Sequence, residues 1–383
     1  MKRIHMASAT LNQTPLDWEG NRGRILAAID AARVQAVQIL CLPELAITGY
    51  GCEDAFHGGW VAEQAWEILE ELLPASVGMV VCVGLPVRER GHLYNGAALM
   101  VDGRLAGVVC KQHLASDGVH YEPRWFRPWE PGRRTVLGSE NVPLGDLCFE
   151  VDGLRICFEI CEDAWVATRP GRTALDRELD VILNPSASYF AFGKQEVRRR
   201  LVLEGSRAFG VAYLYANLLG NEAGRVIYDG GAMVAVCGEL VNESPRLSFA
   251  DFQLSVATVD VDQVRDYRAR SGGMAGAARD DDDGFVVTSI ELEVAMAPAA
   301  AAAAPAWDAG SDIKEQEFAR VVALGLYDYL RKSRSRGFVV SLSGGADSAA
   351  VVCLVWLMCK LARTWFSTGA VRSTWHPGMT SER

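Results

Sequence analysis

The sequence predicts an α/β fold in which a mixed β-sheet is faced by helices. Apolar, strand-like runs recur along most of the chain and alternate with amphipathic helical stretches. The Asp-Gly step at Asp102-Gly103 joins two of these runs, which predicts a β-hairpin. A chain of 383 residues is long enough for two domains. We therefore expect a large α/β domain followed by part of a second one.

The expected elements follow from apolar runs and from helical periodicity. Strands are expected at residues 37–42, 79–85, 97–101, 105–110, 154–160, 181–183, 212–215, 232–237 and 256–261. Helices are expected at residues 21–34, 61–73, 172–179 and 194–209. From Asp312 onward a further helix leads into an expected buried strand at 337–342 and then into a helix that begins near Ala349.

Composition changes suggest where the chain divides. Residues 271–283 are rich in Gly and Ala and end in four aspartates, so we expect a mobile surface loop there. The Ala/Pro-rich stretch around 297–306 is the expected domain boundary. The last residues have no helical or strand period and resemble the tail of a truncated product. The predicted segments are a first domain at 1–292, a linker at 293–311, the start of a second domain at 312–362 and an atypical tail at 363–383.

Charge and composition exclude several classes of protein. A net charge of −10 argues against binding to nucleic acid or to an anionic membrane surface. The apolar run at 349–359 is shorter than the roughly 20 residues that a bilayer requires. No targeting segment is apparent, and the ten cysteines lie mostly in apolar runs without metal-like pairs. We expect a cytoplasmic protein whose cysteines are reduced core residues.

Three expected strands of the first domain each lead into a reactive side chain. Glu44 follows 37–42, Lys111 follows 105–110, and Cys161 follows 154–160. The carboxyl ends of such strands meet at one rim of an α/β sheet, where sites are usually built. A thiolate can attack an amide carbonyl, an ammonium can stabilise both the thiolate and the oxyanion, and a carboxylate can move the protons. The trio therefore predicts amide hydrolysis through a thioester.

The order and local context of these residues resemble the nitrilase, or carbon–nitrogen hydrolase, family over about residues 1–290. The resemblance implies an αββα sandwich that needs no cofactor. It implies that Cys161 is the nucleophile, Glu44 the general base and Lys111 the oxyanion partner, with the backbone N–H of Glu162 as the second oxyanion donor. It also places Glu122 as a second glutamate that supports the lysine. No metal is expected in this domain.

The context Cys161-Glu162-Asp163-Ala164-Trp165 resembles the branch of that family that is fused to NAD⁺ synthetases. In that branch the positions of Tyr50, Ser188 and Lys194 contact the bound glutamine. A carboxylate on such a substrate needs a cation, which makes Lys194 chemically suitable. Each of the three side chains also has an ordinary structural interpretation, as a packed aromatic ring, a turn hydroxyl and a solvated charge.

The run from Ser343 to Ser348 predicts a loop that wraps phosphate at the N-terminus of a helix. It lacks the Gly-Lys-Ser/Thr of a Walker loop and resembles the loop of ATP pyrophosphatases, in a doubly wound domain of the adenine-nucleotide α-hydrolase type. The expected ATP-binding residues are Ser343, Gly344, Gly345, Asp347 and Ser348. Asp347 accepts but does not donate hydrogen bonds when ionised, so it could orient Mg²⁺ or the loop itself.

Together the two parts resemble the glutamine-dependent NAD⁺ synthetase family, a group of ligases. The resemblance implies glutamine, ATP with Mg²⁺, and deamido-NAD⁺ as reactants, and a homo-oligomeric protein. That family's second domain continues well beyond its loop, so we expect this chain to be competent only for glutamine hydrolysis. Two alternatives remain: a stand-alone amidase that acts on a small linear amide, and a non-catalytic assembly subunit.

Overall fold

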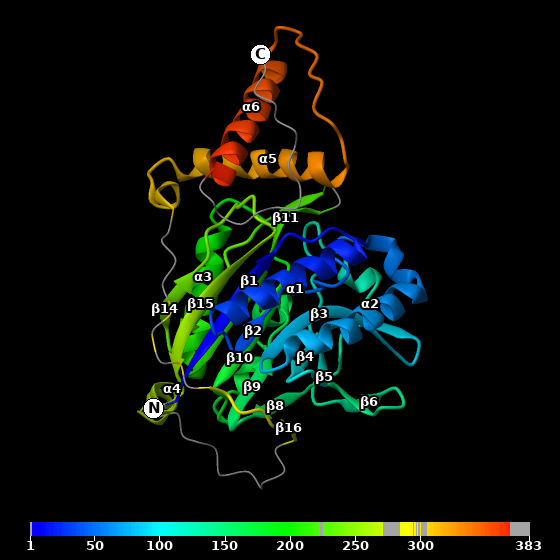
Figure 1. The fold of residues 1–383 in the computed structure, drawn as a ribbon, viewed down its shortest axis with the longest axis vertical. Coiled ribbons are helices and arrows are strands. Elements are labelled where there is room, and N and C mark those ends of the chain that lie inside the picture. Colours follow the sequence, from blue (N-terminus) through cyan, green and yellow to red (C-terminus); the bar gives the residue numbers. More distant parts are fainter. Residues whose placement is uncertain are drawn as a thin grey trace.

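The fold is an α/β sandwich built on one curled sheet, seen in a computed structural model (Figure 1). The structure describes residues 2–222, 225–270, 284–293, 295, 297, 299 and 305–367. The strands are β1 Arg3–Leu11, β2 Ile39–Cys41, β3 Val80–Glu89, β4 His92–Val101, β5 Arg104–Cys110, β6 Arg134–Leu137, β7 Val142–Gly145, β8 Cys148–Val151, β9 Leu154–Phe158, β10 Val181–Ser186, β11 Ala212–Glu222, β12 Val226–Asp229, β13 Met233–Val236, β14 Glu239–Glu243, β15 Phe252–Asp260 and β16 Phe285–Thr288. The α-helices are α1 Trp18–Val34, α2 Gly59–Leu72, α3 Lys194–Phe209, α4 Val261–Arg270, α5 Ile313–Lys332 and α6 Ala346–Ser367.

The sheet is mixed, with a parallel centre. Its main path runs β16-β8-β9-β10-β11-β1-β2-β3-β4-β5-β7-β6. Strands β9, β10, β11, β1, β2 and β3 are paired in parallel along this path. The two antiparallel pairings β3–β4 and β4–β5 return β5 to the direction of β3. The β4–β5 connection is the expected hairpin, with both Asp102 and Gly103 at positive φ.

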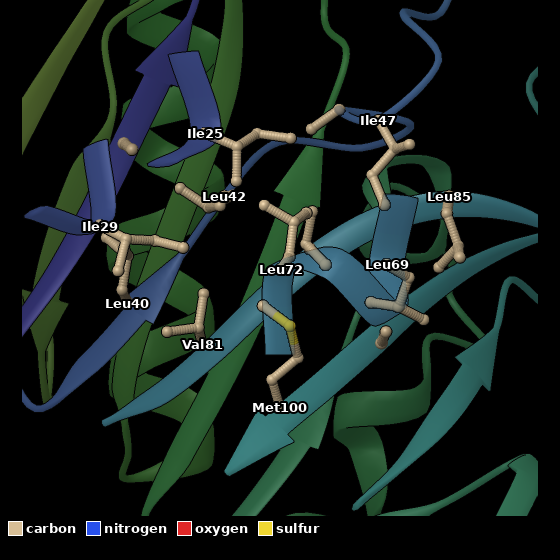
Figure 2. Close-up of a cluster of buried hydrophobic side chains, with 14 of the residues drawn as sticks. Ile25, Ile29, Leu40, Leu42, Ile47, Leu69, Leu72, Val81, Leu85 and Met100 are labelled. Carbon is tan, nitrogen blue, oxygen red and sulfur yellow. The ribbon is translucent and has the colours of Figure 1, made fainter. Parts of the chain in front are cut away.

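Three buried apolar clusters show the order of the layers. One lies between helices α1 and α2 and the sheet, and Figure 2 shows its side chains interlocking from both helices and from β2, β3 and β4. A second is made of alternate residues from both halves of the curled sheet, such as Val80 of β3 and Ile156 of β9. A third packs α3 against the opposite face of β10 and β11. Because successive strand residues point to opposite faces, these clusters give the predicted order of helix, sheet, sheet and helix.

The parallel arrangement brings the ends of distant strands to one edge of the sheet. Glu44 follows β2, Lys111 follows β5, and Cys161 lies shortly after β9. Gly84 of β3 lets the loop that carries Glu44 lie against the strand, since any side chain there would collide with the backbone of residues 43–45. Helix α5 crosses the same edge above β11 (Figure 1).

Most of the expected elements are confirmed, but three expectations are wrong. Residues 172–179 do not form an α-helix: a short 3₁₀ turn at Pro170–Thr173 is followed by turns, and Glu178 adopts a positive φ that a helix does not allow. The segment 337–342 is not a buried strand, because it has no strand partner among the described residues and exposes Val339 and Leu342. Helix α6 continues to Ser367, so residues 363–367 of the expected irregular tail are helical.

One strand was not predicted, and some expectations fall on residues that the structure does not describe. Strand β1, which lies in the centre of the sheet, was not expected from its mixed sequence. The expected mobile loop at 271–283 and residues 368–383 lie outside the described part of the chain. Of the linker, the 3₁₀ turn Ala306–Ala309 is described, and Asp308 pairs with Arg246 of the first domain.

The cysteines differ from the expectation that all are reduced. Cys148 of β8 and Cys157 of β9 face each other on neighbouring strands and are joined as a disulfide, with their Cα atoms 4.6 Å apart. Most of the others are buried, as expected, but Cys353 on α6 is exposed. Sequence spacing did not reveal the pairing, because it depends on how β8 and β9 align in the sheet.

Helix α6 packs on α5 and leaves much of its apolar surface exposed. Met358 and Ala362 contact the cluster around Leu324 of α5, whereas Val351 and Trp356 face solvent. Its 22 residues make it the one helix in the described part of the chain that is long and apolar enough to cross a membrane. This differs from the expectation drawn from the shorter run 349–359. A single helix of this kind is weak evidence for a membrane span, because core helices meet the same criterion.

Candidate active site

A fully buried lysine and two glutamates form the centre of the site. Lys111 Nζ lies 2.6 Å from Glu44 Oε1 and 2.8 Å from Glu122 Oε1. Each of the three side chains is at most 1% exposed. Asn95 Nδ2 of β4 donates to the same two oxygens, at 2.7 and 3.3 Å. The other oxygen of Glu122 accepts the backbone N–H of Ala115 at 2.9 Å. Glu122 therefore holds the lysine in place, while Oε2 of Glu44 has no hydrogen-bond partner among the described residues.

Cys161 stands at the turn after β9, where its backbone takes up a conformation that is rare for a non-glycine residue. Its φ is 48°, and it begins the 3₁₀ turn Cys161–Ala164. The side chain is 6% exposed and interacts electrostatically with both Glu44 and Lys111. A strained turn of this kind is maintained only where the surrounding structure fixes it, and such turns are concentrated at functional sites. The structure therefore brings the thiol, the lysine and the glutamate together.

Asp163 ties the loop of the lysine to the loop of the cysteine. One carboxylate oxygen accepts the backbone N–H groups of Gln112 and His113, at 3.1 and 2.8 Å. The other accepts the N–H of Ile160 at 3.1 Å. The residues after Lys111 and before Cys161 thus share one buried carboxylate, which fixes the relative position of the two reactive groups.

Burial changes the acid–base properties of the reactive groups. It raises the pKa of Glu44 to about 7, although the charge of Lys111 acts in the opposite direction. Burial also raises the pKa of the Cys161 thiol, and the Glu44 charge adds to this effect while Lys111 opposes it. Burial alone would lower the pKa of Lys111, but the charges of Glu122 and Glu44 outweigh it and keep the ammonium protonated. In the resting site the thiol keeps its proton, and a carboxylate with a pKa near neutrality is suited to remove it.

Aromatic rings pack beside Glu122. Tyr50 packs edge-on against His120 and Tyr228, with ring centroids 5.3 and 6.4 Å apart, and donates its hydroxyl to Glu122 at 2.9 Å. Burial lowers the pKa of His120 to about 4, so this ring is neutral at neutral pH. Tyr50 thus closes the site around Glu122 instead of standing as an isolated packed ring.

Ser188 follows β10 and Lys194 begins α3. Tyr189 lies between them in the sequence, and its ring contacts that of His120, with centroids 5.0 Å apart. Ser188 is buried, and its N–H donates to Asn217 Oδ1 at 2.8 Å. The Lys194 ammonium lies 3.6 Å from the centre of the Tyr189 ring and interacts electrostatically with Cys161. Burial lowers its pKa, and no carboxylate forms a salt bridge with it in the described part of the chain. A half-buried ammonium in this position can take the carboxylate of a small molecule.

Four further residues belong to this site and were not predicted from the sequence: Asn95, His120, Asp163 and Tyr228. Asn95 lies inside a strand, and its pairing with the two glutamates depends on the alignment of β4 beside β3. Asp163 lies in the run Cys161–Trp165, whose pattern indicated a branch of the family but no contact made by Asp163 itself. A buried polar residue within an apolar strand, as at Asn95, is the one signal that could have indicated a role.

The loop at 343–348, predicted to bind phosphate, differs from this buried site because it is exposed. Gly344 has a φ of 80°, and the hydroxyls of Ser343 and Ser348 lie 3.3 Å apart at the start of α6. Gly345 N–H donates to Ser343 Oγ at 3.4 Å. Residues 341–347 are exposed, including Asp347. Among the described residues, no three His, Cys, Asp or Glu side chains are grouped to hold a metal ion, and Asp347 belongs to no such group.

Comparison with known proteins agrees with this geometry. Residues 5–269 match the family model of carbon–nitrogen hydrolases. A solved structure of an amidase from Nesterenkonia sp. has a TM-score of 0.56 and 24% identity, and it covers 70% of this chain and 95% of its own. At that identity the likeness supports the fold alone.

Longer matches extend into the second segment. The chain is 32% identical over 377 residues to the glutamine-dependent NAD(+) synthetase of Saccharomyces cerevisiae, a match that covers 94% of this chain and 52% of the relative. The crystal structure of a glutamine-dependent NAD(+) synthetase from Cytophaga hutchinsonii has a TM-score of 0.77 and 41% identity, covering 96% of this chain and 53% of that one. The chain thus spans about half the length of these relatives.

The family match covers the strands and turns that carry Glu44, Lys111, Glu122 and Cys161. The layered sheet is the one that the family resemblance implied, and it brings the side chains at the strand ends together. The chain belongs to the carbon–nitrogen hydrolase family.

Proposed function

We propose that this chain is the glutamine-hydrolysing part of a glutamine-dependent NAD⁺ synthetase. In this proposal it converts glutamine to glutamate and ammonia through a thioester on Cys161. The observation that carries the proposal is the buried Glu44–Lys111–Glu122 cluster beside Cys161, in which one oxygen of Glu44 has no hydrogen-bond partner among the described residues. The relatives named above support the choice of glutamine as the substrate.

The first half of the reaction forms the thioester. Glu44 Oε2 takes the thiol proton of Cys161, and the sulfur attacks the side-chain amide carbon of glutamine. The carbonyl oxygen becomes an oxyanion that is stabilised by the Lys111 ammonium and by the backbone N–H of Glu162. Glu44 passes its proton to the amide nitrogen, the C–N bond breaks, and ammonia leaves. The acyl group remains on sulfur.

The second half releases glutamate. Glu44, again ionised, takes a proton from a water molecule as the water oxygen attacks the thioester carbon. The C–S bond breaks, the proton returns to the sulfur, and glutamate departs as its free acid. Glu122 and Asn95 stay in place throughout, because they hold Lys111 and Glu44 at the distances that both halves require.

The substrate is selected by groups beyond the reacting amide. Lys194 is half-buried, lies on the Tyr189 ring and has no carboxylate partner among the described residues, which suits it to the carboxylate of glutamine. Ser188 and Tyr50 complete the proposed glutamine contacts. Propionamide lacks both the carboxylate and the ammonium and should be a poor substrate.

In the whole protein, the ammonia would amidate deamido-NAD⁺ after ATP has activated its carboxylate. The loop at 343–348 is suited to phosphate because its glycines and hydroxyls precede helix α6. When bound there, ATP supplies the adenylating group, and Asp347 is the residue that could reach its magnesium ion. A glutamine-dependent NAD⁺ synthetase from Acinetobacter baumannii, whose structure resembles this one, is a complex with adenosine diphosphate, which supports the proposal of a nucleotide here.

The test compares initial ammonia release from glutamine, asparagine and propionamide at equal concentration, with Cys161→Ala as the control. The proposal predicts that glutamine is fastest and that the variant releases no ammonia above background. Propionamide faster than glutamine would favour a stand-alone amidase. Wild-type protein inactive on all three amides would favour a non-catalytic assembly role.

A further inference from the structure

A further buried carboxylate, that of Glu222, lies next to the site and has no role in the reaction described above. Glu222, the last residue of β11, is 1% exposed. One of its oxygens accepts two backbone N–H groups, from Tyr50 at 2.9 Å and from Gly51 at 2.8 Å. Its other oxygen has no hydrogen-bond partner among the described residues. A buried carboxylate that binds two consecutive amides fixes the backbone on which Tyr50 stands.

The contacts continue from Tyr50 to the reactive groups. The Tyr50 hydroxyl donates to Glu122 Oε1 at 2.9 Å, and that oxygen also accepts Lys111 Nζ at 2.8 Å. A displaced Tyr50 backbone would withdraw the hydroxyl and leave Glu122 with fewer donors. The position of the lysine that supports the thiolate would then change.

On its other side, Glu222 lies close to helix α5. Lys332, the last residue of α5, buries its ammonium and donates to the backbone carbonyls of Gln13 and Asn221, each at 2.7 Å. These carbonyls follow β1 and end β11, at the edge of the sheet that carries the site. Asp328, one turn earlier, accepts the N–H of Asn221 at 2.8 Å. The charge of Lys332 acts directly on the carboxyl of Glu222.

We propose that Glu222 is a positioning residue of the amidase site and that Lys332 of α5 keeps its carboxylate ionised and bound to the Tyr50–Gly51 backbone. Helix α5 is thereby part of the amidase site, although it lies outside residues 5–269 that match the hydrolase family. The activity assay for this inference rests on the proposed glutamine hydrolysis. The contacts of Glu222 with the Tyr50–Gly51 backbone do not depend on which amide is the substrate.

The charged and titratable groups around Glu222 define how pH acts on it. Burial raises the pKa of Glu222 to about 7, and Lys332 and Arg24 of α1 oppose this rise. Burial lowers the pKa of Lys332 itself to about 8. Cys52 and Tyr228 also face Glu222, but burial raises the pKa of Cys52 to about 12 and that of Tyr228 well above its usual value, so both stay neutral. Removing the Lys332 charge should therefore leave Glu222 protonated at neutral pH and ionised only at higher pH.

The experiment uses the full chain with Lys332→Gln and Glu222→Gln, and Lys314→Gln as the matched control, since Lys314 is exposed on the same helix. At about pH 7, Lys332→Gln should lower kcat/KM for glutamine roughly fivefold, because a rise of one unit in the pKa of Glu222 removes most of its ionised form. The loss should shrink to about 1.3-fold by about pH 8.5. Glu222→Gln should be slower at every pH, because its neutral amide cannot regain the charge. Lys314→Gln should match the wild type.

A second measurement separates this inference from the proposed function. Alkylation of Cys161 by iodoacetamide, followed by peptide mass spectrometry, reports thiolate formation without glutamine. The ratio of the Lys332→Gln rate to the wild-type rate should rise with pH in the same way. If the wild type releases no ammonia but the alkylation ratio rises, the proposed function fails and the role of Glu222 stands.

Two results would overturn the inference. One is that the ratio of the Lys332→Gln value to the wild-type value, for both kcat/KM and the alkylation rate, stays constant across pH. A merely structural defect would give this result, because it would not depend on the protonation of Glu222. The other is wild-type behaviour of Glu222→Gln. If Lys332→Gln does not fold, the Glu222→Gln comparison decides the question by itself.

Discussion

Replacing Lys111 with methionine should destabilise the protein in a way that depends on pH. Lys111 is fully buried and is the cation that contacts both Glu44 and Glu122. Methionine fills a similar volume but leaves two carboxylates close together without a positive charge. Breaking a buried ion pair by removing one partner costs about 3–5 kcal/mol. For a domain of this size, the loss corresponds to a decrease in Tm on the order of 10 °C.

The pH dependence identifies the cause. At about pH 8 the wild-type Glu44 is ionised, so the variant must either bury its unpaired charge or take up a proton when it folds. Without the lysine, the pKa of Glu44 should rise further above its unfolded value, because Lys111 lowers it in the wild type. A carboxyl group with a raised folded pKa destabilises the protein above its unfolded pKa, and this cost disappears as the group becomes protonated at lower pH. The Tm difference between variant and wild type should therefore shrink at about pH 5.

Differential scanning fluorimetry at the two pH values measures this difference directly. The exposed lysine variant Lys314→Met is the control and should melt as the wild type does at both pH values. An equal loss of Tm at pH 5 and pH 8 would refute the electrostatic explanation and indicate a packing defect. Glutamine hydrolysis by Lys111→Met should be absent at either pH, because the oxyanion has lost its cation.

Three further outcomes follow from the site. The kcat/KM for glutamine should fall as the pH drops below about 7, because Glu44 must be ionised to act as the base and burial raises its pKa to about 7; full activity at pH 5.5 would contradict this assignment. Lys194→Met should raise KM for glutamine by about 10–100-fold and change KM for propionamide little, because only glutamine has a carboxylate that the lysine can bind. An equal rise in KM for both amides would exclude a role of Lys194 in carboxylate binding. Asp163→Ala should lower kcat by at least about tenfold with KM nearly unchanged, because the loops of Lys111 and Cys161 lose their shared acceptor, and an unchanged kcat would show that other contacts hold these loops.

The parts of the site that could be predicted from sequence are those encoded locally. Glu44, Lys111 and Cys161 each come within three residues after an apolar strand, so the order of strands and reactive residues was visible without a structure. The alternation of strands and helices predicted a mixed sheet faced by helices, and the family resemblance implied the order of the layers. By contrast, Asn95 reaches Glu44 only because β4 pairs with β3. Contacts between strands depend on their alignment, which short-range patterns do not specify.

Two of the wrong expectations have the same physical origin. The apolar segment 337–342 has the composition of a strand, yet a strand forms only where a neighbour accepts its backbone hydrogen bonds. The Cys148–Cys157 disulfide likewise results from the pairing of β8 with β9. Glu222 illustrates the point for function: nothing in its sequence surroundings indicates that it binds the backbone of Tyr50, which lies far away in the chain.

The central claim, that Cys161 forms a thioester with the acyl group of glutamine, can be tested by one measurement. Wild-type protein mixed with glutamine and quenched in acid within a turnover should be digested and examined by mass spectrometry. The account predicts a γ-glutamyl adduct on the peptide that contains Cys161, absent from Cys161→Ala. Ammonia release by the wild type without an adduct on that peptide, or continued release by Cys161→Ala, would contradict the account.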